Sequence, residues 1–219
     1  DFGGYQELKI SLAREEGSSE LTDGITADDS CFEILDKVSN DIYCSLELTK
    51  RAVDKDALEQ AAKALLCAQQ IFIYGLGNSA SVALDFEHKL LRAGLRAAAF
   101  SDNHMQAITA SHLTDKDIAV GISHSGSSKD IVDALKIAKQ RGALTICITN
   151  KGKSPITKAA DITLFTASNE TQYTILGLNS RISQLSIISS LYYYIVCHHK
   201  EISEEAIEMT ETALQNKKY

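Results

Sequence analysis

From residue 71 onward, short apolar runs alternate with longer amphipathic stretches, and this alternation restricts the chain to few folds. The runs are IFIYG (71–75), AAAFS (97–101), DIAVGIS (117–123), ALTICIT (143–149) and DITLF (161–165). Such runs, bounded by turn residues, indicate buried strands. Strands separated by helices form right-handed βαβ units, with the strands parallel and helices on both faces of the sheet. The sequence therefore predicts an α/β fold with a five-stranded parallel sheet between two helical layers (αβα).

The first thirty residues have a different texture. Residues 1–16 hold a short helical pattern with too little apolar surface to fold alone. Residues 17–30 are rich in Gly, Ser, Thr and Asp, which is typical of a linker. We expect the domain to cover residues 31–219, with a helical extension before the first strand. A long helix from about residue 174 to 199 and a last helix capped by Ser203 complete the prediction.

Charge and cysteine usage exclude several classes of protein. The net charge of −7 makes this chain by itself a poor binder of nucleic acid. Its five cysteines are single and odd in number, which favours buried free thiols over a disulfide framework. Since neither a signal peptide nor a membrane-spanning run is evident, we expect a cytoplasmic protein that does not contact membranes. No His or Cys cluster has metal-ligand spacing, and we expect neither metal nor cofactor.

Two loops rich in glycine and serine follow the first and third predicted strands. In open parallel sheets, ligands bind where strand ends lead into helix N-termini. Glycines let the backbone approach a ligand, while serine hydroxyls and backbone N–H groups donate to phosphate oxygens. The candidate binding residues in these loops are Gly75, Gly77, Asn78, Ser79, Ser123, Ser125, Gly126, Ser127 and Ser128.

Each loop also has a simpler interpretation. Ser79 could be an ordinary helix N-cap, and Ser127 with Asp130 could form an ordinary capping box. A dinucleotide site is the other rival, because the spacing of Gly75 and Gly77 loosely matches its fingerprint and Asp102 could bind a ribose. A second serine-rich loop after the third strand has no use in such a site. The pair of loops therefore favours a shared site for a phosphate-bearing ligand.

The stretch from residue 71 to about 196 resembles a sugar isomerase (SIS) domain, most closely that of the bacterial RpiR-type (MurR/RpiR) transcriptional regulators. The matching motifs are IYGLGNSAS, KLLRAGLRAAAFSDNHMQAITASHL, DIAVGISHSGSSKDIVDALKIAKQRGALTICITN, the SP-x-x-x-x-AD of residues 154–161, and NSRISQLSIISSLYYYI. The leading GYQELKISLARE resembles the end of these regulators' helix-turn-helix domain. The resemblance thus implies that the DNA-binding part is missing from this chain and that DNA is contacted only through it.

The resemblance also assigns roles. Ser79, Ser123, Ser125, Ser127 and Ser128 would hold the phosphate of a sugar-phosphate effector, with the loop glycines and Asn78 supplying shape and backbone donors. Such domains form homodimers or tetramers, with the N-terminal helices and the long late helix between subunits. The implied function is effector sensing that allosterically controls DNA binding and, through it, carbohydrate metabolism.

An aldose–ketose isomerase is the alternative. Glu170 stands where the family's isomerases place their catalytic base, and His104 opens a helix from which it could reach the ligand. The His-Pro-Gly segment of arabinose-phosphate-type isomerases has no counterpart here, so the catalytic apparatus is partial. Arg181 could contact the sugar, bridge subunits or form a structural ion pair. A third possibility is a non-catalytic module that regulates a partner such as a kinase.

Overall fold

The computed structural model describes residues 24–168 and 178–217, and its centre is a sheet of five parallel strands in the order β2-β1-β3-β4-β5. The strands are β1 (Ile71–Gly75), β2 (Ala97–Phe100), β3 (Ile118–Ile122), β4 (Leu144–Asn150) and β5 (Ile162–Thr166). Every predicted strand is present within one or two residues of its expected ends. All five carboxyl ends consequently lie along one edge of the sheet.

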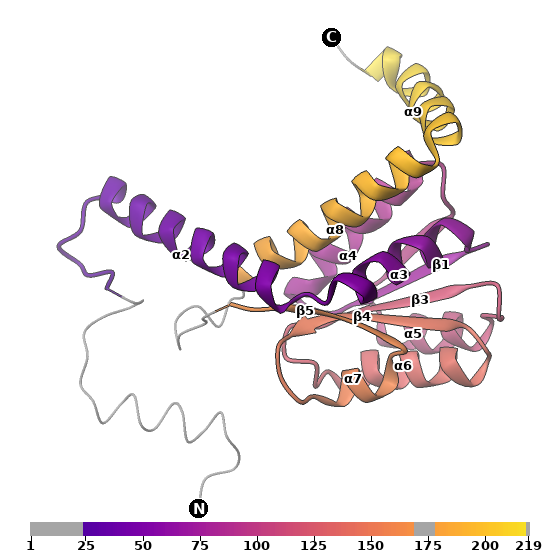
Figure 1. The fold of residues 1–219 in the computed structure, drawn as a ribbon, viewed down its shortest axis with the longest axis horizontal. Coiled ribbons are helices and arrows are strands. Elements are labelled where there is room, and N and C mark those ends of the chain that lie inside the picture. Colours follow the sequence, from indigo (N-terminus) through magenta and orange to yellow (C-terminus); the bar gives the residue numbers. More distant parts are fainter. Residues whose placement is uncertain (1–23, 169–177, 218–219) are drawn as a thin grey trace, which may run out of the picture.

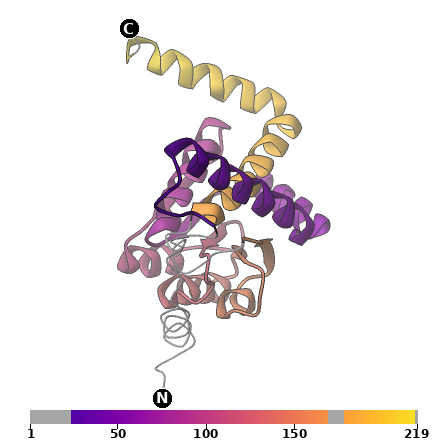
Figure 2. The ribbon, with the colours of Figure 1, turned by 90° about the vertical axis from the view of Figure 1, so that its left-hand side faces the viewer.

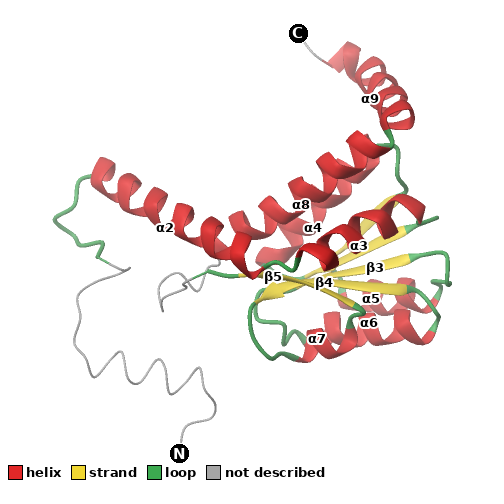
Figure 3. Ribbon diagram, viewed as in Figure 1, coloured by secondary structure: helices red, strands yellow, loops and turns green. Residues whose placement is uncertain are grey.

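Helices cover both faces of the sheet (Figures 1 and 3). One layer contains α3 (Lys55–Cys67), α4 (Asn78–Arg92) and α8 (Leu178–His198), and the other contains α5 (Asn103–Ser111), α6 (Lys129–Gln140) and α7 (Pro155–Ala159). Because successive strand side chains point to opposite faces, Ile73 enters the first core and Tyr74 the second. This arrangement confirms the predicted three-layer α/β fold.

Two helices extend beyond the sheet. α2 (Cys31–Ala52) packs on α8 and β5 near its C-terminal end, while α9 (Lys200–Leu214) leads away from the body at the other end of α8 (Figures 1 and 2). The short helix η2 (Gln215–Lys217) follows α9. The predicted cap of the last helix is wrong: His199 precedes α9, and Ser203 is buried within it, where its hydroxyl donates to the Ala93 carbonyl at 3.3 Å.

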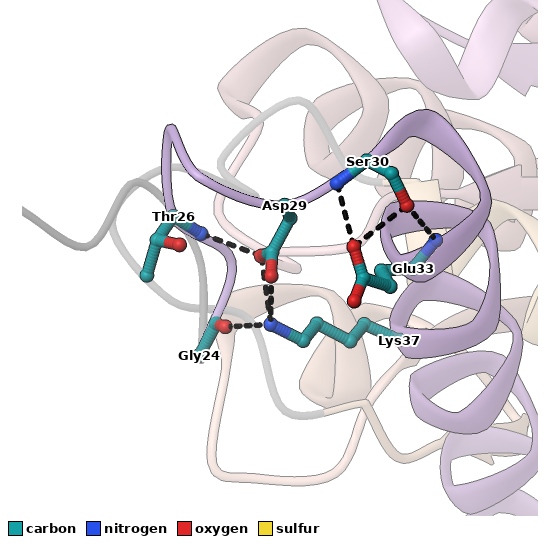
Figure 4. A network of polar contacts seen from close by, with 6 residues as sticks. All are labelled: Gly24, Thr26, Asp29, Ser30, Glu33 and Lys37. Atoms are coloured by element: carbon teal, nitrogen blue, oxygen red, sulfur yellow. Dashed lines mark hydrogen bonds and ion pairs between the residues drawn. The ribbon is translucent and has the colours of Figure 1, made fainter.

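Residues 24–30, at the end of the predicted linker, fold back on the start of α2 (Figure 4). Ser30 and Glu33 form a capping box, in which each side chain bonds the other residue's backbone N–H. The Lys37 ammonium reaches back to Asp29, at 2.7 Å from Oδ2, and to the carbonyl of Gly24. Asp29 also accepts from the backbone N–H of Thr26 at 2.8 Å. These contacts attach residues 24–30 firmly to the first two turns of α2.

The expectation of buried thiols holds for one cysteine. Cys147 is fully buried in β4, but the other four are exposed because they lie on helix surfaces that face away from the sheet: Cys31, Cys44, Cys67 and Cys197. In the described ranges no two cysteines form a disulfide. Within the same residues, none of the helices is both long and apolar enough to cross a membrane.

Candidate functional site

The first loop of the candidate site turns from β1 into α4 through a close backbone approach. A Cβ atom on Gly75 would lie 2.6 Å from the carbonyl oxygen of Ser79, so only glycine fits there. Gly77 adopts a φ of 55°, which favours glycine, and it precedes the first turn of α4. Ser79 is buried at 8% exposure, whereas Gly77 and Asn78 are exposed. The two glycines thus bring the first N–H groups of α4 to the carboxyl edge of the sheet.

The second loop folds on itself after β3. The Ser123 hydroxyl lies 3.2 Å from that of Ser128 and accepts the N–H of Gly126, also at 3.2 Å. Ser125 and Ser127 are exposed, and the Ser127 hydroxyl donates to that of Ser125 at 2.9 Å. The loop therefore has a buried frame and an outer pair of hydroxyls that face solvent.

The helices that follow these loops begin without a side-chain cap. The N-cap residues of α4 and α6 are Gly77 and Ser128, and neither forms a side-chain capping bond to its helix. By contrast, α2, α3 and α5 are capped by side chains: Ser30, Asp54 and Asp102, respectively. The alternative readings of Ser79 as an N-cap and of Ser127–Asp130 as a capping box are therefore wrong. Two uncapped helix N-termini at one sheet edge favour a bound anion.

A third polar segment, formed by the end of β4 and the residues after it, packs against the second loop. Ser154 and Thr149 are the nearest side chains to Gly126, whose φ is 62° and whose carbonyl accepts the N–H of Ile156 at 3.0 Å. Ser154 Oγ and Asn150 Oδ1 are buried without a hydrogen-bond partner. In the sequence, Ser154 stands out only as part of a family motif, since a polar residue before a proline is typical of any turn.

Gln106 of α5 also lies at this edge, although it is not among the predicted site residues. It is fully buried, and its amide nitrogen donates to the carbonyl of Phe100 at 2.8 Å and to that of Gly75 at 3.4 Å. It therefore holds the ends of β1 and β2 together beneath the first loop. Its Oε1 atom is buried without a partner. A lone glutamine in an amphipathic helix carries no sequence signal for such a position.

The first turns of α8 bury polar rather than apolar side chains. These residues are Asn179, Ser180, Ser183 and Gln184. The Ser183 hydroxyl and both amide atoms of Gln184 have no hydrogen-bond partner. Arg181 is half-buried and, with Asp85 and Ser81 of α4, lines a cavity of about 280 Å³ between α4 and α8. Arg181 is thus placed beside α4, near the edge at which both loops end.

Of the remaining candidates, the structure describes His104 and Asp102. Glu170 lies outside the described residues. His104 is exposed in the first turn of α5. Asp102 caps that helix by accepting the N–H of Met105 at 2.8 Å, so its carboxylate already has a structural role. In residues 24–168 and 178–217, no group of three His, Cys, Asp or Glu side chains could hold a metal ion.

The described part of the site is rich in hydrogen-bond donors. Both loops offer hydroxyl and backbone N–H groups, and neither contains a carboxylate. Two titratable groups in the sheet beneath are held in their neutral forms, because burial raises the pKa of Tyr74 to about 12 and that of Cys147 to about 11. A phosphate or another oxyanion fits this arrangement of donors.

Comparison with known proteins gives consistent similarities. Residues 64–194 match the profile of the SIS domain. An uncharacterised helix-turn-helix transcriptional regulator of Caldanaerobacter subterraneus is 37% identical over 217 residues, which cover 94% of this chain and 76% of that protein. The helix-turn-helix regulator RpiR of Escherichia coli is 30% identical, with 96% and 71% covered. The fold resembles that of Vibrio vulnificus NanR complexed with ManNAc-6P, with a TM-score of 0.85, 23% identity, and coverage of 99% and 77%.

Proposed function

The chain belongs to the SIS domain family, and from that membership we propose that it is the effector-binding domain of an RpiR-type regulator and holds a sugar phosphate at its two serine loops. The observation that carries the proposal is the pair of uncapped helix N-termini, α4 and α6, which open from adjacent strands at one edge of the sheet. The phosphate would accept hydrogen bonds from their N–H groups and from Ser125 and Ser127.

The relatives support this choice of ligand and context. NanR, whose fold this chain shares, was solved with ManNAc-6P, an amino-sugar phosphate. The curated relatives are helix-turn-helix regulators, and the chain spans 71–76% of their length. We propose that a helix-turn-helix domain supplies the DNA contacts, since the net charge of this chain is −7.

We further propose that the domain acts as a homodimer or a higher oligomer. Large apolar side chains are exposed on the two projecting helices and the end of α8, where they have little to cover them within one chain. They are Phe32, Leu35, Tyr43 and Leu48 on α2, Tyr193 on α8, and Ile202 and Met209 on α9. A second copy that packs on these helices would bury them. Sedimentation at micromolar concentration should show an oligomer, and a monomer there would overturn the assembly.

Control of DNA binding would follow from a shift in population. A sugar phosphate that binds one arrangement of the subunits more tightly than another favours that arrangement, and only the difference between the two affinities contributes. The spacing of the attached DNA-binding domains would then change with ligand concentration.

The test is thermal unfolding with a panel of hexose, pentose and amino-sugar phosphates, each paired with its unphosphorylated sugar. At about 100 times its Kd, a ligand adds roughly 2.7 kcal/mol to stability, which shifts Tm by about 5–10 °C for a chain of this size. Stabilisation by a phosphosugar and not by the free sugar is the expected result. If no phosphosugar moves Tm, the proposed site is wrong.

Each stabilising ligand is also assayed for turnover. Binding without product formation supports a sensor. Conversion of an aldose phosphate to its ketose would instead make the chain an isomerase, and a Glu170→Gln variant would then report whether this carboxylate is the base.

A further inference from the structure

Thr49 joins α2 to the end of β5 by two hydrogen bonds with one residue. Its hydroxyl donates to the carbonyl of Ala167 at 3.0 Å and accepts the N–H of Ala167 at 3.0 Å. Ala167 directly follows β5. Thr49 is 2% exposed, so water does not compete for these bonds. The Thr49 side chain thus makes the two backbone hydrogen bonds that a neighbouring strand would otherwise make with Ala167.

Further hydrogen bonds continue from this point to the second serine loop. The hydroxyl of Thr166 donates to the carbonyl of Thr149 at 3.2 Å, and both residues are fully buried. The Thr149 hydroxyl donates to the carbonyl of His124, within the loop, at 3.3 Å, and the N–H of Asn150 donates to the same carbonyl at 3.1 Å. Backbone and hydroxyl groups therefore connect residues 123–128 to α2 through the ends of β4 and β5.

α2 has few other buried attachments. Of its 22 residues only Ser45 and Thr49 are fully buried. Residues 24–30 are attached to its N-terminal turns by the bonds of Lys37 to Asp29 and Gly24. A displacement at Thr49 would therefore move α2 and residues 24–30 together. In the proposed regulator, the segment toward the DNA-binding domain lies on that side.

We propose that Thr49 is a positioning residue that couples occupancy of the second serine loop to α2, through the bonds that link His124, Thr149, Thr166 and Ala167. The ligand part of this inference rests on the proposed function, whereas the coupling within the protein does not. Two sites are coupled when a change at one alters the free energy at the other, and the effect is the same in both directions.

The coupling can be measured without ligand by amide hydrogen exchange. Thr49→Val keeps the shape of the side chain and removes both bonds to Ala167, so exchange in residues 31–52 and 162–168 should accelerate by about tenfold. Thr210→Val is the matched control, since its hydroxyl bonds only to Ala206 in its own helix, and it should leave both segments unchanged. Unchanged exchange in Thr49→Val would overturn the proposed attachment.

A mutant cycle tests whether the bonds act as a unit. Thr166→Val breaks the bond to Thr149, and the double variant with Thr49→Val should accelerate exchange in residues 31–52 by about threefold less than the product of the single effects. Effects that multiply would show independent bonds and overturn the coupling.

Millimolar inorganic phosphate is the probe for the ligand part. In the wild type it should slow exchange in residues 123–128 and also in 31–52; in Thr49→Val the first effect should remain and the second disappear. Equal protection of residues 31–52 in both proteins would overturn the role of Thr49. If phosphate protects residues 123–128 in neither protein, the proposed ligand site fails, while the mutant cycle still decides the coupling.

Discussion

Gly126 and Ser154 are in such close contact that a Cβ atom on the glycine would lie 2.3 Å from Ser154 Oγ. The same Cβ would be 2.8 Å from the Thr149 hydroxyl. The second serine loop is therefore pressed against the segment that follows β4, and the absence of a side chain at residue 126 is what permits it. The position of the exposed hydroxyls of Ser125 and Ser127 depends on this contact.

Gly126→Ala should destabilise the fold and displace the loop. The substitution combines a left-handed backbone conformation with a clash in a packed site, for a loss of about 2–5 kcal/mol in the free energy of unfolding by urea. Gly77→Ala is the matched control, because Gly77 has a φ of 55° but no atom within 4 Å of its added Cβ. Its loss should be about 1–3 kcal/mol, from backbone strain alone. Equal losses in the two variants would contradict the contact with Ser154.

Ser125→Ala and Ser127→Ala should weaken sugar-phosphate binding with little change in Tm. Both hydroxyls are exposed and bond each other, and the Ser125 hydroxyl also accepts the N–H of Ser127 at 3.3 Å. A bound phosphate would accept from both hydroxyls. Loss of a hydrogen bond to a charged group corresponds to about 1–3 kcal/mol of binding free energy, measured by titration calorimetry. Ser111→Ala is the control, since that exposed hydroxyl bonds the carbonyl of Ile108 in its own helix. Wild-type affinity in both loop variants would exclude their contact with phosphate.

The fold could be predicted because its signals are local. Each strand is a short apolar run between turn residues, and parallel βαβ units allow few arrangements. The cap of the last helix could not be predicted in this way. The Ser203 hydroxyl bonds the carbonyl of Ala93, which lies 110 residues away in the chain. A serine followed by acidic residues matches the local pattern of an N-cap, and that pattern does not reveal a hydrogen-bond partner far away in the chain.

The binding site stays a prediction, and only part of its surroundings could be read from the sequence. Glycine and serine spacing identified both loops, since those residues serve the local backbone. Gln106 and Ser154 were missed because their roles depend on contacts with other loops: Gln106 with the carbonyl of Gly75, and Ser154 with Gly126. Arg181 was a candidate because it lies in a motif of the resemblance, and the structure shows the cavity that it lines.

Lys37→Met should release residues 24–30 from α2. The lysine ammonium bonds Asp29 and the carbonyl of Gly24, and its hydrogen bond is the main reason that the pKa of Asp29 lies below its ordinary value. In the variant, the amide of Thr26 should exchange about tenfold faster, because its acceptor is no longer held. Lys63→Met, which breaks only the pair with Glu59 on the surface of α3, should leave that amide unchanged. Unchanged exchange at Thr26 in Lys37→Met would show that the ion pair does not hold this segment.

Asp161 should contribute stability that depends on pH. Its carboxylate accepts from the N–H and the hydroxyl of Thr145, at 3.0 and 2.7 Å, and pairs with Lys139 at 2.5 Å. Burial alone would raise the pKa of Asp161, but the bonds from Lys139 and Thr145 outweigh it and hold the pKa below its ordinary value of 3.8. The folded state therefore favours the ionised form, so this contribution is complete above pH 3.8 and is lost as the pH falls through the lowered pKa.

Asp161→Asn should consequently lower the free energy of unfolding by about 1–2 kcal/mol at pH 7, with allowance for partial solvent screening. The difference from the wild type should shrink as the pH falls below 3.8, because the wild-type carboxyl then becomes protonated in both states. Urea unfolding at a series of pH values measures it. Asp133→Asn is the control, since Asp133 pairs with Lys136 at 3.3 Å on the exposed surface of α6 and should show almost no difference at any pH. A deficit in Asp161→Asn that stays constant from pH 7 to acid would mean that the lost stability comes from packing and not from the carboxylate charge.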